Sequence, residues 1–178
     1  MKILITSFEP HGFSRKNISK EVAFLLEEIL PDLIKSGEIE FVTLPVNDES
    51  ASTLKAFLKF IKPSPDVIIS MGQSGFGNGF RIESAASDMS IDRIRKEYWL
   101  HNKTKVESDL AKYIALTLKL PLTNKIGHDQ CNAVYAEALR YGQHNAIFCH
   151  IGSRADKRNV ARIMLEIIDK CKEVLKDG

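Results

Sequence analysis

Short apolar runs alternate along the chain with longer segments in which apolar residues recur every three or four positions. The short runs are typical of buried strands, and the longer segments are typical of helices with one apolar face. The clearest helix covers 156–175, where Val160, Ile163 and Met164 begin one apolar face. We expect strands at 2–7, 39–46, 66–71, 145–151 and, more weakly patterned, 81–87. We expect helices at 17–30, 49–61, 107–120, 132–141 and 156–175.

This alternation predicts the fold class. Strands that alternate with helices favour an α/β protein, here a three-layer α/β/α sandwich with a mostly parallel, mixed central sheet of the phosphorylase or hydrolase kind. The length of 178 residues predicts one domain over 1–178. Ligands of such folds bind beyond the carboxyl ends of the strands. Four segments should meet there: 8–12, 72–75, 127–132 and 149–150.

Composition narrows the function classes. Lys and Arg number 25 against 23 Asp and Glu, a net charge of +2, which argues against a nucleic-acid partner. No apolar run reaches the roughly 18 residues of a membrane span, and the first residues do not form a signal peptide. Three cysteines without a CxxC spacing favour a reducing compartment. We therefore expect a cytoplasmic protein without a membrane or nucleic-acid partner.

Cys131 is the strongest candidate for chemistry. It stands at the start of the helix expected over 132–141. A helix N-terminus favours a thiolate, and its N–H groups can hold a developing oxyanion. The alternative is a small buried thiol, which fits Cys149 in a strand and Cys171 on an apolar helix face.

His150 and Glu83 supply the groups that a nucleophilic cysteine needs. His150 closes an apolar strand and could act as the base, although a core histidine is the alternative. Glu83 lies among small and apolar residues, where a carboxylate needs a partner such as an imidazolium. A surface glutamate on an edge strand is its alternative. Arg93 could present donors to an oxyanion.

Metal and phosphate sites are weakly indicated. Gly75, Gly77 and Gly79 lack the spacing of a phosphate-binding loop, and residues 128–131 lack a recurring ligand pair. We predict neither a metal nor a cofactor. A phosphate-binding transferase similar to the nucleoside phosphorylases stays open as another reading of the glycine-rich loop.

Several segments together resemble one family, pyroglutamyl peptidase I, also called pyrrolidone-carboxylate peptidase. They occur in the family's order and cover roughly 1–152. They are Phe8-Glu9-Pro10, Leu44-Pro45-Val46, Pro65-Asp66-Val67-Ile68-Ile69, Gly72-Gln73-Ser74-Gly75, Ile82-Glu83, Arg93-Ile94, Cys131-Asn132 and Phe148-Cys149-His150.

The resemblance implies a cytosolic cysteine peptidase with an α/β/α sandwich fold. Such enzymes remove an N-terminal pyroglutamyl residue from peptides and often assemble as homo-oligomers, here expected as a dimer or tetramer. It places the nucleophile on Cys131, the acid/base on His150, the orienting carboxylate on Glu83 and the oxyanion arginine on Arg93. The implied substrate-binding residues are Phe8, His11 and Gln73.

The chain also departs from the family pattern around the substrate pocket. His11 replaces a phenylalanine, and residues 128–130 replace Thr-Tyr-Val before the nucleophile. These changes motivate a second hypothesis: a relative without peptidase activity that binds acylated peptide ends or a partner protein.

Overall fold

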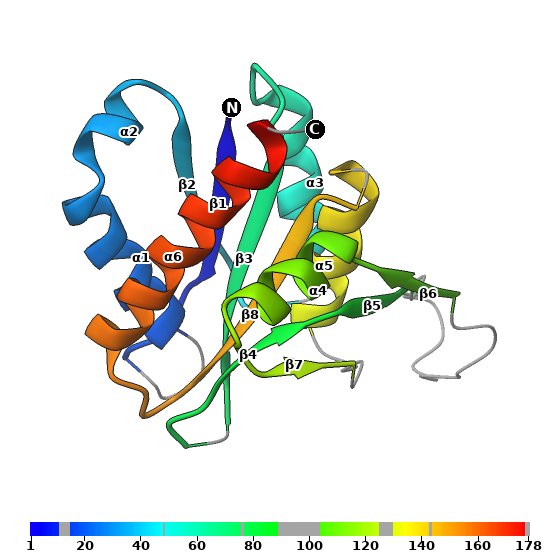
Figure 1. The fold of residues 1–178 in the computed structure, drawn as a ribbon. Helices are drawn as coiled ribbons and strands as arrows, with labels where there is room; N and C mark the ends of the chain where they lie inside the picture. The colour runs from blue at the N-terminus through cyan, green and yellow to red at the C-terminus, as the bar shows by residue number, and fades with distance from the viewer. Residues whose placement is uncertain are drawn as a thin grey trace.

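The computed structural model describes residues 1–10, 15–47, 49–75, 77–88, 104–124, 130–142 and 144–176. Strands and helices alternate along most of the chain (Figure 1). The strands are β1 (Ile3–Phe8), β2 (Ile39–Leu44), β3 (Val67–Ser74), β4 (Phe80–Glu83), β5 (Ala85–Asp88), β6 (Thr104–Glu107), β7 (Leu122–Thr123) and β8 (Ala146–Gly152). The helices are α1 (Ile18–Ile29), α2 (Pro31–Lys35), α3 (Ser50–Phe60), α4 (Asp109–Thr117), α5 (Gln130–Tyr141) and α6 (Lys157–Lys176).

The central sheet is mixed, with the strand order β2-β1-β3-β8-β4-β7. Strands β2, β1, β3 and β8 run parallel to one another, β4 runs antiparallel to β8, and β7 is parallel to β4. A second, two-stranded sheet pairs β5 with β6. The mostly parallel α/β fold expected from the sequence is therefore confirmed.

Helices cover both faces of the central sheet because alternate strand residues point to opposite sides (Figure 1). Ile3 and Ile5 of β1 belong to a core that includes residues of α1, α4 and α6. Leu4 of the same strand belongs to a second core that includes residues of α3 and α5. The candidate site lies on the second side, at the start of α5.

The expected strand over 81–87 is two strands in the structure. It breaks at Ser84: β4 continues the central sheet, while β5 leaves it to pair with β6. The Ser84 N–H donates to the Thr123 carbonyl, and its own carbonyl accepts from the Ser108 N–H. These bonds hold the chain between the two sheets, and the run of small residues around Ser84 gives no sequence sign of the break.

The helix expected from residue 107 begins two residues later. Glu107 ends β6, and the Ser108 hydroxyl accepts from the Ala111 N–H at 3.0 Å as the N-cap of α4. Three short elements, α2, β6 and β7, were not expected. Among the described residues, no helix has the length and apolar character to cross a bilayer.

Candidate active site

Three neighbouring strands place His150 in a row of paired residues, and Glu83 lies opposite Phe148 on the same strand pair. In β8, His150 lies opposite Gly72 of β3 on one side and Arg81 of β4 on the other. Phe148, two residues before His150, shares its sheet face and packs in the core beneath α5. The row therefore faces the helix that carries Cys131.

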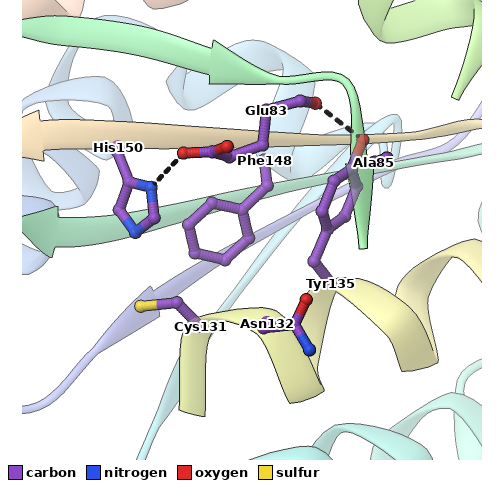
Figure 2. Close-up of a pocket in the computed structure, with 7 residues that line it drawn as sticks. All are labelled: Glu83, Ala85, Cys131, Asn132, Tyr135, Phe148 and His150. Atoms are coloured by element: carbon purple, nitrogen blue, oxygen red, sulfur yellow. Dashed lines mark hydrogen bonds and ion pairs between the residues drawn. The ribbon is translucent and has the colours of Figure 1, made fainter. Parts of the chain in front are cut away.

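Glu83 and His150 form a close polar contact in the site. The Glu83 Oε1 atom lies 2.6 Å from His150 Nδ1, and the Glu83 side chain is 7% exposed (Figure 2). An ionised carboxylate can only accept hydrogen bonds, so Nδ1 carries the proton. The lone pair of the neutral ring then lies on Nε2, which is the tautomer required of a base that acts through that nitrogen.

Arg81 compensates the buried carboxylate and was not identified from the sequence. Its Nε donates to the same Glu83 oxygen at 2.8 Å, and its Nη2 lies 3.4 Å from His150 Nδ1. A buried carboxylate is costly unless it is paired, and the guanidinium provides that pair. Arg81 and Glu83 are two positions apart in a strand, so they share a face; that spacing was the available signal.

Cys131 approaches the row from the first turn of α5. Its side chain and the His150 ring line the same pocket, and Figure 2 shows the sulfur on the side of the ring away from Glu83. Its position is also defined by Gly72, since a β-carbon at that residue would lie 2.9 Å from the Cys131 sulfur. The sulfur thus rests on the strand residue that neighbours His150. The structure brings together Glu83, His150 and Cys131.

Aromatic and amide side chains support this pocket, whose volume is about 40 Å³. That exceeds the roughly 10–15 Å³ needed by one water molecule, so a small group can enter. The Phe148 ring packs edge-on against His150, with centroids 4.9 Å apart. The buried Tyr135 hydroxyl donates to the Glu83 carbonyl at 2.9 Å, and burial raises the pKa of that hydroxyl. The imidazole and carboxylate therefore have fixed surroundings.

The other two cysteines lie in the opposite core, between the sheet and helices α1, α4 and α6. Burial raises the pKa of the Cys149 thiol far above its ordinary value and that of Cys171 to about 12. Both stay neutral thiols at physiological pH, and the thiolate is the nucleophilic form. They fit the structural alternative that the sequence left open. In the described part of the chain, no three His, Cys, Asp or Glu side chains gather as a metal site.

Comparison with known proteins gives the site its context. No protein-family model matches the chain. The pyrrolidone-carboxylate peptidase of Finegoldia magna is 36% identical over 96 residues, which are 53% of this chain and 42% of that protein. The Streptococcus pneumoniae protein of the same name is 32% identical over 95 residues, with the same coverage. Over about half of its length, the chain is similar to the pyrrolidone-carboxylate peptidases. The matched region is less than half the length of these curated relatives.

Solved pyrrolidone carboxyl peptidases share the fold. A mutant of the Pyrococcus furiosus peptidase superposes with a TM-score of 0.75 at 23% identity, covering 98% of this chain and 100% of that one. The Thermococcus litoralis peptidase superposes with a TM-score of 0.71 at 20% identity, covering 99% and 95%. The curated relatives confirm the family resemblance seen in the sequence, and the solved structures confirm the α/β fold.

The remaining residues that the peptidase resemblance indicates lie away from the pocket or outside the described residues. Phe8 is buried in the core shared with α3 and α5, and the Gln73 Oε1 accepts from the Ile18 N–H at the start of α1. Neither is among the described residues that line the pocket. His11 and Arg93 lie outside the described residues. The substrate-binding roles of Phe8, His11 and Gln73 stay predictions.

Proposed function

We propose that this chain is a cysteine exopeptidase that removes an N-terminal pyroglutamyl residue from peptides. One observation carries the proposal: a histidine held by a buried carboxylate shares a pocket with a cysteine at a helix start. The similarity to pyrrolidone-carboxylate peptidases supplies the substrate class. A cytoplasmic location and a homo-oligomer stay predictions.

The first chemical step forms a bond between sulfur and carbon. His150 Nε2 takes the Cys131 proton, while Glu83 holds the ring and stabilises its positive charge. The thiolate attacks the carbonyl carbon between the pyroglutamyl group and the next residue. The carbonyl oxygen becomes an oxyanion, which we assign to Arg93 and to N–H groups at the start of α5.

The second half of the reaction releases both products. The oxyanion collapses, the carbon–nitrogen bond breaks, and the imidazolium gives its proton to the leaving amine. Water, deprotonated by His150, then attacks the thioester, and the carbon–sulfur bond breaks to release pyroglutamate. A positioned acid/base contributes roughly 10²–10⁴-fold to such a step.

The described pocket suits a neutral end group. Ala85 and Phe148 supply apolar surface, and the Glu83 carboxylate already accepts from Arg81 and His150. A protonated amine would therefore lose its hydration without gaining an unshared counter-ion. The uncharged lactam of pyroglutamate does not carry that cost.

The test is release of a chromophore from a pyroglutamyl amide. We expect turnover by the wild type, a loss of more than about 10³-fold in Cys131→Ser, and little change in the control Cys171→Ala on the other side of the sheet. A prolyl amide, which carries an ammonium group, should be a much poorer substrate.

Two results would contradict the proposal. One is equal turnover by the wild type and Cys131→Ser. The other is no turnover by the folded wild type over a panel of pyroglutamyl amides with varied second residues, which would favour a relative that binds acylated ends without cleaving them.

A further inference from the structure

Gly72 occupies an unusual place beside the proposed nucleophile. It lies within β3, where it pairs with His150 of β8, and it is buried. Its backbone has no positive φ, so the strand conformation itself would accept any L residue. Whatever requires glycine here must be the space around it.

That space is filled by two side chains. A β-carbon at Gly72 would lie 2.9 Å from the Cys131 sulfur and 2.8 Å from the Phe148 Cζ atom. Optimal separations between heavy atoms are roughly 3.5–4.0 Å, so a methyl group would overlap both. The sulfur therefore lies where another residue would carry its side chain.

The two neighbours differ in how they can respond. Phe148 is fully buried between the Tyr135 and His150 rings, with ring centroids 5.7 Å and 4.9 Å away. Cys131 is half-buried at the start of α5, and a turn about its single χ angle moves the sulfur. A side chain at residue 72 would therefore displace the sulfur more readily than the ring.

We propose that Gly72 is a positioning residue: because it has no side chain, it leaves the space that the Cys131 sulfur occupies beside His150. The catalytic consequence rests on the proposed function, in which His150 takes the Cys131 proton. Proton transfer needs the two atoms within hydrogen-bond reach, and a misplacement of about 1 Å can cost about 100-fold in rate.

The first experiment compares Gly72→Ala with Gly75→Ala. Gly75 is a matched control because it lies three residues away, is exposed and would place a β-carbon with no atom of the described residues within 4 Å. For each variant we measure kcat/KM for a pyroglutamyl amide and the rate of Cys131 alkylation by iodoacetamide at pH 7.5. We expect Gly72→Ala to lose about 100-fold in kcat/KM and to change its alkylation rate severalfold. Gly75→Ala should stay within about twofold of the wild type.

A second experiment isolates the sulfur, because Gly72→Ala also crowds the Phe148 ring. In a Phe148→Leu background, where the ring is absent, the thermal midpoint is measured for Gly72→Ala, for Cys131→Ala and for both together. The effect of Cys131→Ala on the midpoint is compared with glycine and with alanine at residue 72. We expect this effect to be more stabilising by at least about 3 °C when residue 72 is alanine. Recovery of folding by Cys131→Ala, where Gly72→Ala alone does not fold, supports the proposal in the same way.

The outcomes separate this proposal from the proposed function. Absence of coupling between residues 72 and 131 would contradict the positioning role of Gly72. A folded Gly72→Ala variant with the same alkylation rate as Gly75→Ala would contradict it too. If the wild type does not cleave pyroglutamyl amides, the alkylation and stability measurements still decide the role of Gly72.

Discussion

The Glu83 carboxylate accepts from two cationic or potentially cationic groups at a single oxygen. Arg81 Nε and His150 Nδ1 both lie within 2.8 Å of Oε1. The guanidinium pairs with the buried carboxylate, and the carboxylate accepts a hydrogen bond at His150 Nδ1. Arg81 is therefore part of the arrangement that presents Nε2 to the sulfur.

Replacing Glu83 by glutamine tests this arrangement. The amide of Glu83→Gln is uncharged and cannot stabilise an imidazolium, so we expect kcat/KM for a pyroglutamyl amide to fall about 10²–10⁴-fold. The control is Glu166→Gln, whose half-exposed side chain bonds to Arg162 on α6. Steady-state kinetics on both purified variants give the comparison.

An unchanged kcat/KM in a folded Glu83→Gln variant would remove the carboxylate from the mechanism. Unfolding of that variant would be visible by circular dichroism; Glu83→Asp, which keeps the charge on a shorter side chain, then carries the test. An activity for Glu83→Asp above that of Glu83→Gln would support the charge as the essential property.

Chemistry alone identified three of the residues that meet in the pocket. Cys131 stood out because a helix start favours a thiolate, and His150 and Glu83 stood out because titratable side chains are uncommon among apolar strand residues. Arg81 did not stand out, and Gly72 did so only as part of the segment 72–75. An arginine or a glycine in a strand is ordinary in sequence, and only the pairing of β4 and β3 with β8 shows what they contact.

Between secondary-structure elements, Asn132 makes a polar link from α5 to the smaller sheet. Its Oδ1 accepts from the Ser87 N–H at 3.0 Å, and its Nδ2 donates to the Ser87 carbonyl at 3.2 Å. The side chain is buried, so water cannot easily replace these partners. This amide fixes the first turn of α5, which carries Cys131, against β5.

We expect Asn132→Ala to lower the free energy of unfolding by about 1–3 kcal/mol, because it leaves the Ser87 backbone groups buried without their partner. Urea denaturation followed by circular dichroism measures the change. The control Asn159→Ala, at an exposed position near the start of α6, should cost less than about 0.5 kcal/mol. Equal losses in the two variants would contradict a structural link through Asn132.

The helices themselves could be predicted from the sequence pattern, but several boundaries of helices and strands could not. The long helices were predictable because their apolar faces repeat over several turns, as in α6. The break at Ser84 was not, since Ala85 and Ala86 suit either sheet and the choice depends on pairing with β6. The start of α4 depended on one hydroxyl, that of Ser108, rather than on periodicity.

Across the fold as a whole, the central sheet separates the three thiols. Cys131 lies on the α5 side, whereas Cys149 and Cys171 lie in the core on the α1 and α6 side. Burial keeps the pKa of both core thiols above the ordinary value of 9.0, so neither ionises as the pH rises from 6 to 9. A thiol must be both exposed and deprotonated to react with an electrophile. Unfolding exposes Cys149 and Cys171 and returns their pKa values to the ordinary range.

We therefore expect iodoacetamide at pH 8 to label one thiol per native chain and three in 6 M guanidinium chloride. Mass spectrometry of tryptic peptides assigns the native label to the peptide that contains Cys131. Rapid native labelling of Cys149 or Cys171 would show that this core opens without global unfolding.

The imidazole and its carboxylate partner are built on adjacent strands, β8 and β4, whose backbones are hydrogen-bonded to each other. The sulfur is carried by a helix that rests on this sheet through side chains. A small rigid-body displacement of α5 would therefore change the distance between the sulfur and the imidazole, while the His150–Glu83 contact would keep its length. A small molecule that bridges α5 and β8 would hold that distance fixed, and its binding would also raise the thermal midpoint of the fold.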